Sequence, residues 1–250
     1  MIKRTVENSP QLYARIAGIL YVYIFAAGTF AQLFVRSTLV VSTDAEATAK
    51  NIIANETLFR IGFSGELLHL AFDVIVAVLL YALFKSIDRN IALIAAFMRL
   101  SCDIILAVAS LSHFVALKVL ANADYLNTIS PGQLHTVALI AMKLHGDAYA
   151  ISLVFFSFAC LSLGYLIIIS RYLPKTIGIL MIGAGVLYFA ISFTHFLNPK
   201  LSATITPALF VPIFIAEISF TLWLIVKGVN IEIWERNNNI TAAVNNGERQ

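Results

Sequence analysis

Residues 147–170 read DAYAISLVFFSFACLSLGYLIIIS, and after Asp147 the stretch contains no charged side chain. About 20 helical residues are needed to cross the ~30 Å of hydrocarbon in a bilayer, so this stretch predicts a transmembrane helix. Five further apolar stretches are long enough, at residues 12–35, 59–84, 91–118, 175–197 and 207–228. In lipid every backbone group must be paired internally, which favours helices over strands. The predicted fold is all-α, a polytopic six-helix transmembrane bundle.

The composition points the same way. Hydrophobic residues make up 60% of the 250-residue chain and charged residues 12%, whereas a soluble domain carries about 25% charged residues. The chain therefore has too little polar surface for a soluble fold, and its expected partner is the lipid bilayer. The net charge of +3 is small, and the basic residues are scattered among the loops, which excludes nucleic acid as a partner.

Serine, asparagine, threonine and proline mark the predicted helix ends. Ser9 and Pro10 predict an N-cap and first residue for the first span. Asn198 and Pro199 predict the end of the fifth span. Thr206 and Pro207 predict the start of the sixth in the same way as the first.

Two connections are long enough to hold short helices at the membrane interface. Thr43 and Glu46 have the spacing of a capping box ahead of DAEATAKNIIANE, residues 44–56. Ser130, Pro131 and Gln133 predict a second start. The helix that begins there would be about 60 Å long if it ran unbroken to residue 170, twice the hydrocarbon thickness, so we expect a bend or break near Gly146.

The loop charges predict the orientation. Ten lysines and arginines fall on the side of the N-terminus and six on the opposite side, and a basic excess is typical of cytoplasmic loops. Both termini are therefore expected in the cytoplasm. We expect one transmembrane domain over residues 1–230 and a polar, disordered cytoplasmic tail over 231–250.

A polar stripe interrupts the second span at FSGELLHLAFD, residues 63–73. Glu66, His69 and Asp73 fall on one helix face. Ionisable residues in spans cost at least ~2.5–3.5 kcal/mol each on insertion scales and face the interior by default. By topology, His145 and Asp147 on the fourth span and His195 on the fifth share the outer half of the bundle with Glu66 and His69.

These outer residues predict a ligand-binding site lined by Glu66, His69, His145, Asp147 and His195. Glu66, His69, His145 and His195 are also a candidate metal set, because a Glu-x-x-His spacing lets two side chains reach one ion. A divalent metal such as zinc would suit these ligands. The competing interpretation is interhelical hydrogen bonding that fixes the bundle register. His113 is the weakest candidate in the outer half, and His135 is expected to be a solvated surface residue.

A second polar group is predicted nearer the inner half. Asp73, Arg99 and Asp103 are interpreted as a structural ion pair, because Arg99 and Asp103 are one turn apart and Asp73 lies at a similar depth. Glu217 stands alone on the sixth span and is interpreted as either protonated or paired. No catalytic residue can be assigned, since no nucleophile elbow, P-loop or dinucleotide pattern occurs.

Several motifs carry a family resemblance. They are ARIAGILY, FVRS, FRIGF, AAFMRL, LHG, LGYLI, YLP, SFTHF and PALFVPIFIAEISFTLWLIVKGVN. Together they resemble the bacterial membrane family called domain of unknown function 4386, from about Ala14 to Asn230. The resemblance implies a bacterial integral membrane protein of the cytoplasmic membrane, and it supplies no activity or site residues. A weaker similarity is to membrane hydrolases that hold zinc with three histidines, serine and aspartate. Ser64, His69, Asp73, His145 and His195 supply those residue types, but six spans depart from the seven of that superfamily.

The sequence leaves three hypotheses for function. One is a protein that binds or transports a small molecule or ion in a polar, histidine-containing pocket. Another is a metal-dependent membrane hydrolase that acts on lipid. The third is a structural or accessory subunit whose polar residues serve packing or a protein partner.

Overall fold

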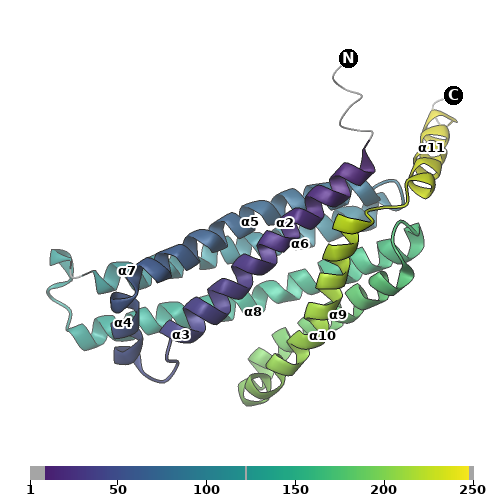
Figure 1. Cartoon of the computed structure of the whole chain (residues 1–250). Helices are drawn as coiled ribbons and strands as arrows, with labels where there is room; N and C mark the ends of the chain where they lie inside the picture. The colour runs from purple at the N-terminus through teal and green to yellow at the C-terminus, as the bar shows by residue number, and fades with distance from the viewer. Residues whose placement is uncertain (1–8, 122, 248–250) are drawn as a thin grey trace. The chain divides into compact units, whose positions relative to one another are not determined.

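The structure is a computed structural model that describes residues 9–121 and 123–247, with side chains described as far as residue 239. These residues form helices, and no strand occurs among them (Figure 1). The elements are α2 (Pro10–Phe30), η1 (Ala31–Arg36), α3 (Ser37–Leu39), α4 (Ala45–Ala54), α5 (Glu56–Phe84), α6 (Arg89–Ala109), α7 (Leu111–Leu120), η2 (Asp124–Leu126), α8 (Pro131–Ser170), α9 (Lys175–Leu197), α10 (Pro199–Val226) and α11 (Ile231–Gly247).

Six helical segments among the described residues are long and apolar enough to cross a membrane. They cover Pro10–Leu39, Glu56–Phe84, Arg89–Leu120, Pro131–Ser170, Lys175–Leu197 and Pro199–Val226. Large apolar side chains are exposed along them, for example Phe97 at 62% and Ile104 at 64%. Water would disfavour such a surface, whereas lipid is as apolar as the side chains. The predicted all-α, six-helix membrane fold is confirmed.

Several predicted helix ends are right. The Ser9 hydroxyl accepts a hydrogen bond from the Leu12 N–H, and α2 begins at Pro10. Helix α8 begins at Pro131, where the Gln133 side-chain oxygen accepts from both the N–H and the hydroxyl of Ser130. Helix α4 also forms as predicted, but its N-cap is Asp44 rather than Thr43. The Asp44 carboxylate accepts from the Ala47 N–H at 2.9 Å, which leaves no capping role for Thr43.

The predicted start of the sixth span at Thr206 and Pro207 is wrong. Helix α10 begins eight residues earlier, at Pro199, because the Asn198 side chain accepts from the Leu201 N–H and so caps a new helix where one was expected only to end. Pro207 and Pro212 then lie inside α10. Prolines are tolerated in membrane helices where neighbouring groups compensate the lost backbone bond.

The break that the sequence predicts near Gly146 does not occur. Helix α8 is continuous over its 40 residues. A glycine in a helix costs only about 1 kcal/mol relative to alanine and leaves the backbone N–H in place. Buried side chains on both sides of Gly146, among them Met142 and Leu153, keep the helix packed on either flank.

The polar tail forms a helix rather than a disordered segment. Residues Ile231–Gly247 make up α11. The Asn230 side chain caps its first turn by accepting from the Ile233 N–H, and the Asn230 N–H donates to the Tyr172 carbonyl oxygen. A capped first turn that is tied to a neighbouring loop stabilises a helix that composition alone would not predict. The domain boundary at residue 230 stays a prediction.

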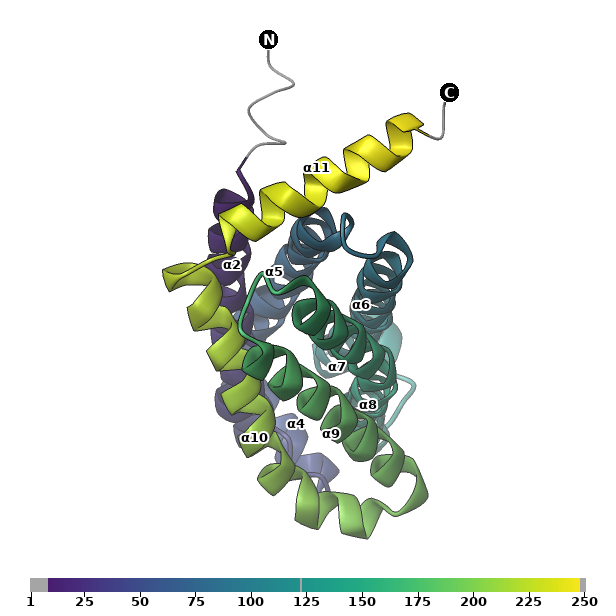
Figure 2. The ribbon, with the colours of Figure 1, turned by 90° about the vertical axis from the view of Figure 1, so that its right-hand side faces the viewer.

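The chain divides into two compact units, which we describe separately. Unit 1 consists of residues 1–22, 73–102 and 153–250. In it α9 and α10 run beside each other, as both views show (Figures 1 and 2). Helices α8 and α9 touch backbone to backbone, because a Cβ on Gly164 would lie 2.6 Å from the Gly178 carbonyl oxygen. Such close approach of membrane helices through small residues is a common packing mode.

At one end of unit 1, hydrogen bonds connect the start of α2 with the end of α10, and the loop after α5 with the loop after α8. The Gln11 side chain donates to the Lys227 carbonyl oxygen and accepts from the Val229 N–H, across the turn at Gly228 with φ +68°. The Ser86 hydroxyl lies 3.2 Å from the Tyr172 hydroxyl. Burial raises the pKa of this tyrosine. The start of α2, the loops after α5 and α8, and the end of α10 therefore meet at one end of unit 1.

Unit 2 consists of residues 23–72 and 103–152. Its apolar core is formed by side chains from η1, α3, α4, α5, α7 and α8, namely Val35, Leu39, Ala49, Ile52, Phe59, Ala116, Leu117, Leu120, Ala138, Ala141 and Met142. The short helix α4 packs against α3 and α7, beside which it lies in Figure 1. This core includes Phe59 near the start of α5 and one face of α7, and these two helices supply residues of the candidate site.

Candidate metal centre

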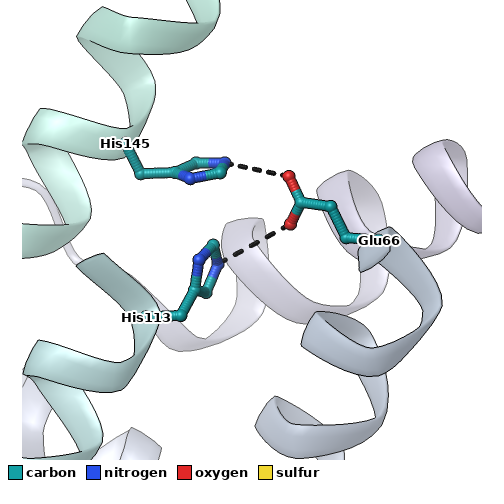
Figure 3. A group of neighbouring side chains, drawn as sticks. All are labelled: Glu66, His113 and His145. Carbon is teal, nitrogen blue, oxygen red and sulfur yellow. Dashed lines mark ion pairs between the residues drawn. The ribbon is translucent and has the colours of Figure 1, made fainter. Parts of the chain in front are cut away.

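Three buried side chains of unit 2 point toward one another, as Figure 3 shows. Glu66 comes from α5, His113 from α7 and His145 from α8. One ligand atom from each lies within 4.8 Å of the others. The exposed fractions are 8% for Glu66, 3% for His113 and 1% for His145. We call these three residues the buried triad.

The two imidazoles flank the Glu66 carboxylate. Nε2 of His145 lies 3.2 Å from Oε1, and Nε2 of His113 lies 3.9 Å from Oε2. The two rings meet edge to face, with centroids 4.4 Å apart. The carboxylate therefore uses a different oxygen toward each histidine, and the three side chains face a common point.

A fourth residue, Arg36, contacts the triad from the end of the first span. Its Nη1 lies 3.2 Å from Glu66 Oε2 and 2.8 Å from His145 Nε2. Its Nε donates to the Gln32 side-chain oxygen at 3.0 Å. Both residues lie in η1, a π-helical segment after which the Ser37 N–H donates to the Gln32 carbonyl oxygen. Such segments inside α-helices occur frequently at functional sites.

The two ring nitrogens of His145 have different neighbours. Nε2 lies 2.8 Å from the Arg36 guanidinium, which only donates, and 3.2 Å from Glu66 Oε1, which accepts. Nδ1 faces the Ala109 carbonyl oxygen at 3.4 Å. In metal-binding histidines one nitrogen commonly faces the metal while the other faces a backbone carbonyl or a carboxylate.

His113 lies in an aromatic environment. Phe59 and Phe63 pack against it, with centroids 5.4 and 5.8 Å away. Its Nδ1 is buried and has no hydrogen-bond partner among the described residues. Its Nε2 is too far from Glu66 for a hydrogen bond. Buried polar atoms are nearly always paired, so this ring needs an explanation.

The structure brings together only part of the predicted ligand set. Glu66 and His145 are in the buried triad. His69 is half-buried on α5 and faces α2, since a Cβ on Gly28 would lie 3.6 Å from its Cε1, and Asp147 is exposed. His195 is half-buried and belongs to unit 1. Among the described residues these three are outside the triad.

Arg36 contacts the buried triad although it is not among the predicted ligands. The predicted first span ends near Arg36, but the helical segment continues to Leu39, so Arg36 lies within it. The sequence signal for this contact is the spacing of Gln32 and Arg36, which are one helical turn apart. This spacing lets the Gln32 side-chain oxygen accept a hydrogen bond from the guanidinium.

His113 belongs to the buried triad although it is the weakest candidate of the outer half in the sequence. The sequence places it near the outer end of its span, where histidine is tolerated at little cost. Its neighbours Ser112 and Ala116, both small and buried, are the available signal that this face of α7 points to the interior.

The predicted inner pair is present in unit 1. Arg99 forms an ion pair with Asp73 and donates to the Tyr21 hydroxyl. The guanidinium also lies over the Tyr21 ring, 4.7 Å from its centroid. Asp103 is buried one turn farther along α6, and its role in this pair stays a prediction.

Comparison with known proteins gives one match. The family model described as Domain of unknown function (DUF4386) matches residues 16–228. No curated protein matches the chain, and no solved structure matches it.

Proposed function

The chain belongs to the DUF4386 family, and since that description names no activity, we propose a function from the buried triad: the protein binds a divalent transition-metal ion within unit 2. Glu66, His113 and His145 are the proposed ligands. Of the three hypotheses from the sequence, this is the one in which the protein binds an ion, now with a class of ion and three ligands. It keeps Glu66 and His145 from the predicted ligand set and adds His113, while the other three predicted ligands have no part in it.

The observation that carries the proposal is the convergence of three buried ligand atoms within 4.8 Å from three different helices. A buried histidine and carboxylate could equally serve packing, but a direct ion pair or hydrogen bond does not account for the position of His113. Its Nε2 faces the Glu66 carboxylate from 3.9 Å, which is too far for a hydrogen bond. A metal ion at the common point of the triad would be bound by this nitrogen.

The chemistry of the ligands narrows the choice of ion. Two imidazoles and one carboxylate suit Zn²⁺, Fe²⁺ and neighbouring transition metals better than Mg²⁺ or Ca²⁺, which prefer oxygen ligands. Ligands about 2.1 Å from a tetrahedral zinc are about 3.4 Å from each other. The 3.2 Å between His145 Nε2 and Glu66 Oε1 is close to that spacing. Of the three ligands, only His113 has to move inward to complete the site.

The test is metal binding by purified protein in nanodiscs. We expect one equivalent of Zn²⁺ or Co²⁺ after reconstitution, measured by elemental analysis and by titration. Replacing His113, His145 or Glu66 by Gln is expected to weaken binding at least tenfold. A ligand should matter at least this much, because mutation of residues that only hydrogen-bond to the ligands already lowers metal affinity by roughly 10–100-fold.

Two substitutions provide matched controls. His135→Gln changes a half-buried histidine on the same helix as His145, and Glu56→Gln changes an exposed glutamate on the same helix as Glu66. Both should bind metal like the wild type. A wild-type protein that binds no stoichiometric metal would refute the proposal and leave the structural-subunit hypothesis. A lipid hydrolase would also need the metal, so activity assays on lipids follow only if binding is found.

We also propose where the protein lies and how it is oriented: in the bacterial inner membrane, with both termini in the cytoplasm. Six spans return the chain to the side on which it started. The end of unit 1 that gathers Gln11, Ser86, Tyr172 and Lys227 supports a common side for these loops. Exposed basic residues follow α5 and α8 at that end, namely Lys85, Arg89 and Arg171, and basic loops face the cytoplasm.

A further inference from the structure

A second group of buried ionisable residues lies in unit 1 and has no part in the buried triad. Its central member is Glu217, on α10, with an exposed fraction of 6%. Ile213 and Phe220, one turn away on either side, are buried as well. An ionised carboxylate in such a setting is strongly disfavoured unless a cation or several hydrogen bonds compensate it.

The nearby cation is already engaged by another carboxylate. The positive charge of Arg99 attracts the Glu217 carboxylate. The ion pair of Arg99 is nevertheless with Asp73, and Arg99 also donates a hydrogen bond to the Tyr21 hydroxyl. Phe156 covers another part of the guanidinium, with its ring centroid 5.2 Å away. Among the described residues no ion pair to Glu217 forms within 4.0 Å.

The other titratable groups around Glu217 bring no positive charge. They are Tyr21 on α2, Cys160 on α8 and Tyr188 on α9. A phenol and a thiol are neutral near pH 7 unless something stabilises their ionised forms. The group therefore contains one cation, Arg99, and two carboxyl groups, Asp73 and Glu217. If both carboxyl groups were ionised, this buried group would have a net charge of −1.

The hydrogen bonds near Glu217 show how the charge can be neutralised. The Tyr188 hydroxyl donates to Oε1 at 2.9 Å. Thr221, one turn farther along α10 and on the same face, is 3% exposed, and its hydroxyl oxygen has no partner among the described residues. A protonated carboxyl group has an O–H to donate, and Thr221 offers a buried acceptor within one turn.

We propose that Glu217 is a proton-binding site in the membrane-spanning part of unit 1. A proton from hydronium adds to the carboxylate, which leaves water and a neutral acid. The acid keeps the Tyr188 hydroxyl as a donor to one oxygen and directs its own O–H from the other oxygen toward Thr221. The ligand is a proton, and the site is independent of any metal at the buried triad.

The test is infrared difference spectroscopy of the full chain in nanodiscs at pH 7, in which the spectrum of each variant is subtracted from that of the wild type. Wild-type protein should show a protonated-carboxyl stretching band, and Glu217→Gln should lose it. The amide is isosteric with the neutral acid and can still accept from Tyr188, so the variant should fold. Glu56→Gln, an exposed glutamate ion-paired with Arg60, is the matched control and should leave the band unchanged.

A second variant keeps the proposal testable if Glu217→Gln does not fold. Tyr188→Phe removes the donor to Oε1, so the same band should shift to higher frequency without being lost. A wild-type spectrum with no carboxyl band that depends on Glu217 or Tyr188 would overturn the proposal. A band that disappears when Na⁺ is added at constant pH would also overturn it, because the site would then take a metal cation.

Discussion

Arg36 occupies the position in unit 2 where a bound cation would compete with it most directly. Its Nη1 contacts one oxygen of Glu66 and Nε2 of His145. A metal ion would need the same lone pairs. The guanidinium therefore compensates the charge of Glu66 whenever no metal is bound, and it must move away when a metal binds.

This competition gives a residue-scale prediction. Replacing Arg36 by Gln removes the competing charge, so the affinity for Zn²⁺ should rise about tenfold or more, since an ion pair with a largely buried carboxylate is worth at least about 1.4 kcal/mol in competition. Isothermal titration of the variant against wild type measures the change. Arg60→Gln is the control, because Arg60 pairs with Glu56 on the surface. Unchanged or weaker zinc affinity in Arg36→Gln would show that Arg36 does not compete for the site.

The same residues show how much of the site the sequence can reveal. Glu66 and His145 are predictable because ionisable residues are rare in spans and face the interior. His113 and Arg36 have only weak signals in the sequence, because their positions depend on the π-helical turn of η1 and on the packing of α7.

At the scale of elements, the six spans are predictable from sequence and several of their ends are not. Apolar length is a strong signal because the bilayer sets it. The end of a helix depends on one or two hydrogen bonds. Asn198 has the pattern of a residue that ends one helix, but its side chain caps the next. Gly146 has the pattern of a break, but packing on both sides of it outweighs a small loss of propensity.

Two glycines of α9 give an element-scale prediction. A Cβ on Gly178 would lie 2.6 Å from Ile168 Cγ1 and 2.7 Å from the Gly164 carbonyl oxygen, whereas nothing lies within 4 Å of a Cβ on Gly183. Gly178→Ala should therefore force α8 and α9 apart and cost about 1–3 kcal/mol. Gly183→Ala should be neutral or stabilising by up to about 1 kcal/mol.

Thermal unfolding of both variants in the same detergent measures the difference. The two substitutions add the same methyl group to the same helix, so propensity cancels and only the contact with α8 differs. Equal midpoints for the two variants would mean that α8 and α9 do not pack through these glycines.

At the scale of the whole molecule, the six spans predict that Asn239 and Asp124 face opposite sides of the membrane. Asp124 lies in the connection after the third span, and Asn239 lies in α11, beyond the sixth. Both are exposed. In a background without Cys102 and Cys160, Asp124→Cys should react with a membrane-impermeant maleimide on intact cells. Asn239→Cys should react only after permeabilisation.

The opposite pattern would reverse the orientation while leaving the fold unchanged. Labelling of both positions on intact cells would contradict the odd number of spans, three, that lies between them.

The length of α8 determines how an ion could reach the buried triad. Counting back from Ser170, about 20 residues cover the hydrocarbon thickness and reach residue 151. His145 is six residues farther, which is about 9 Å along the helix axis. For a helix near the membrane normal, this places His145 in the headgroup layer, where water and ions are present. An ion would then enter the triad from the water–lipid boundary without the dehydration cost of crossing the bilayer interior.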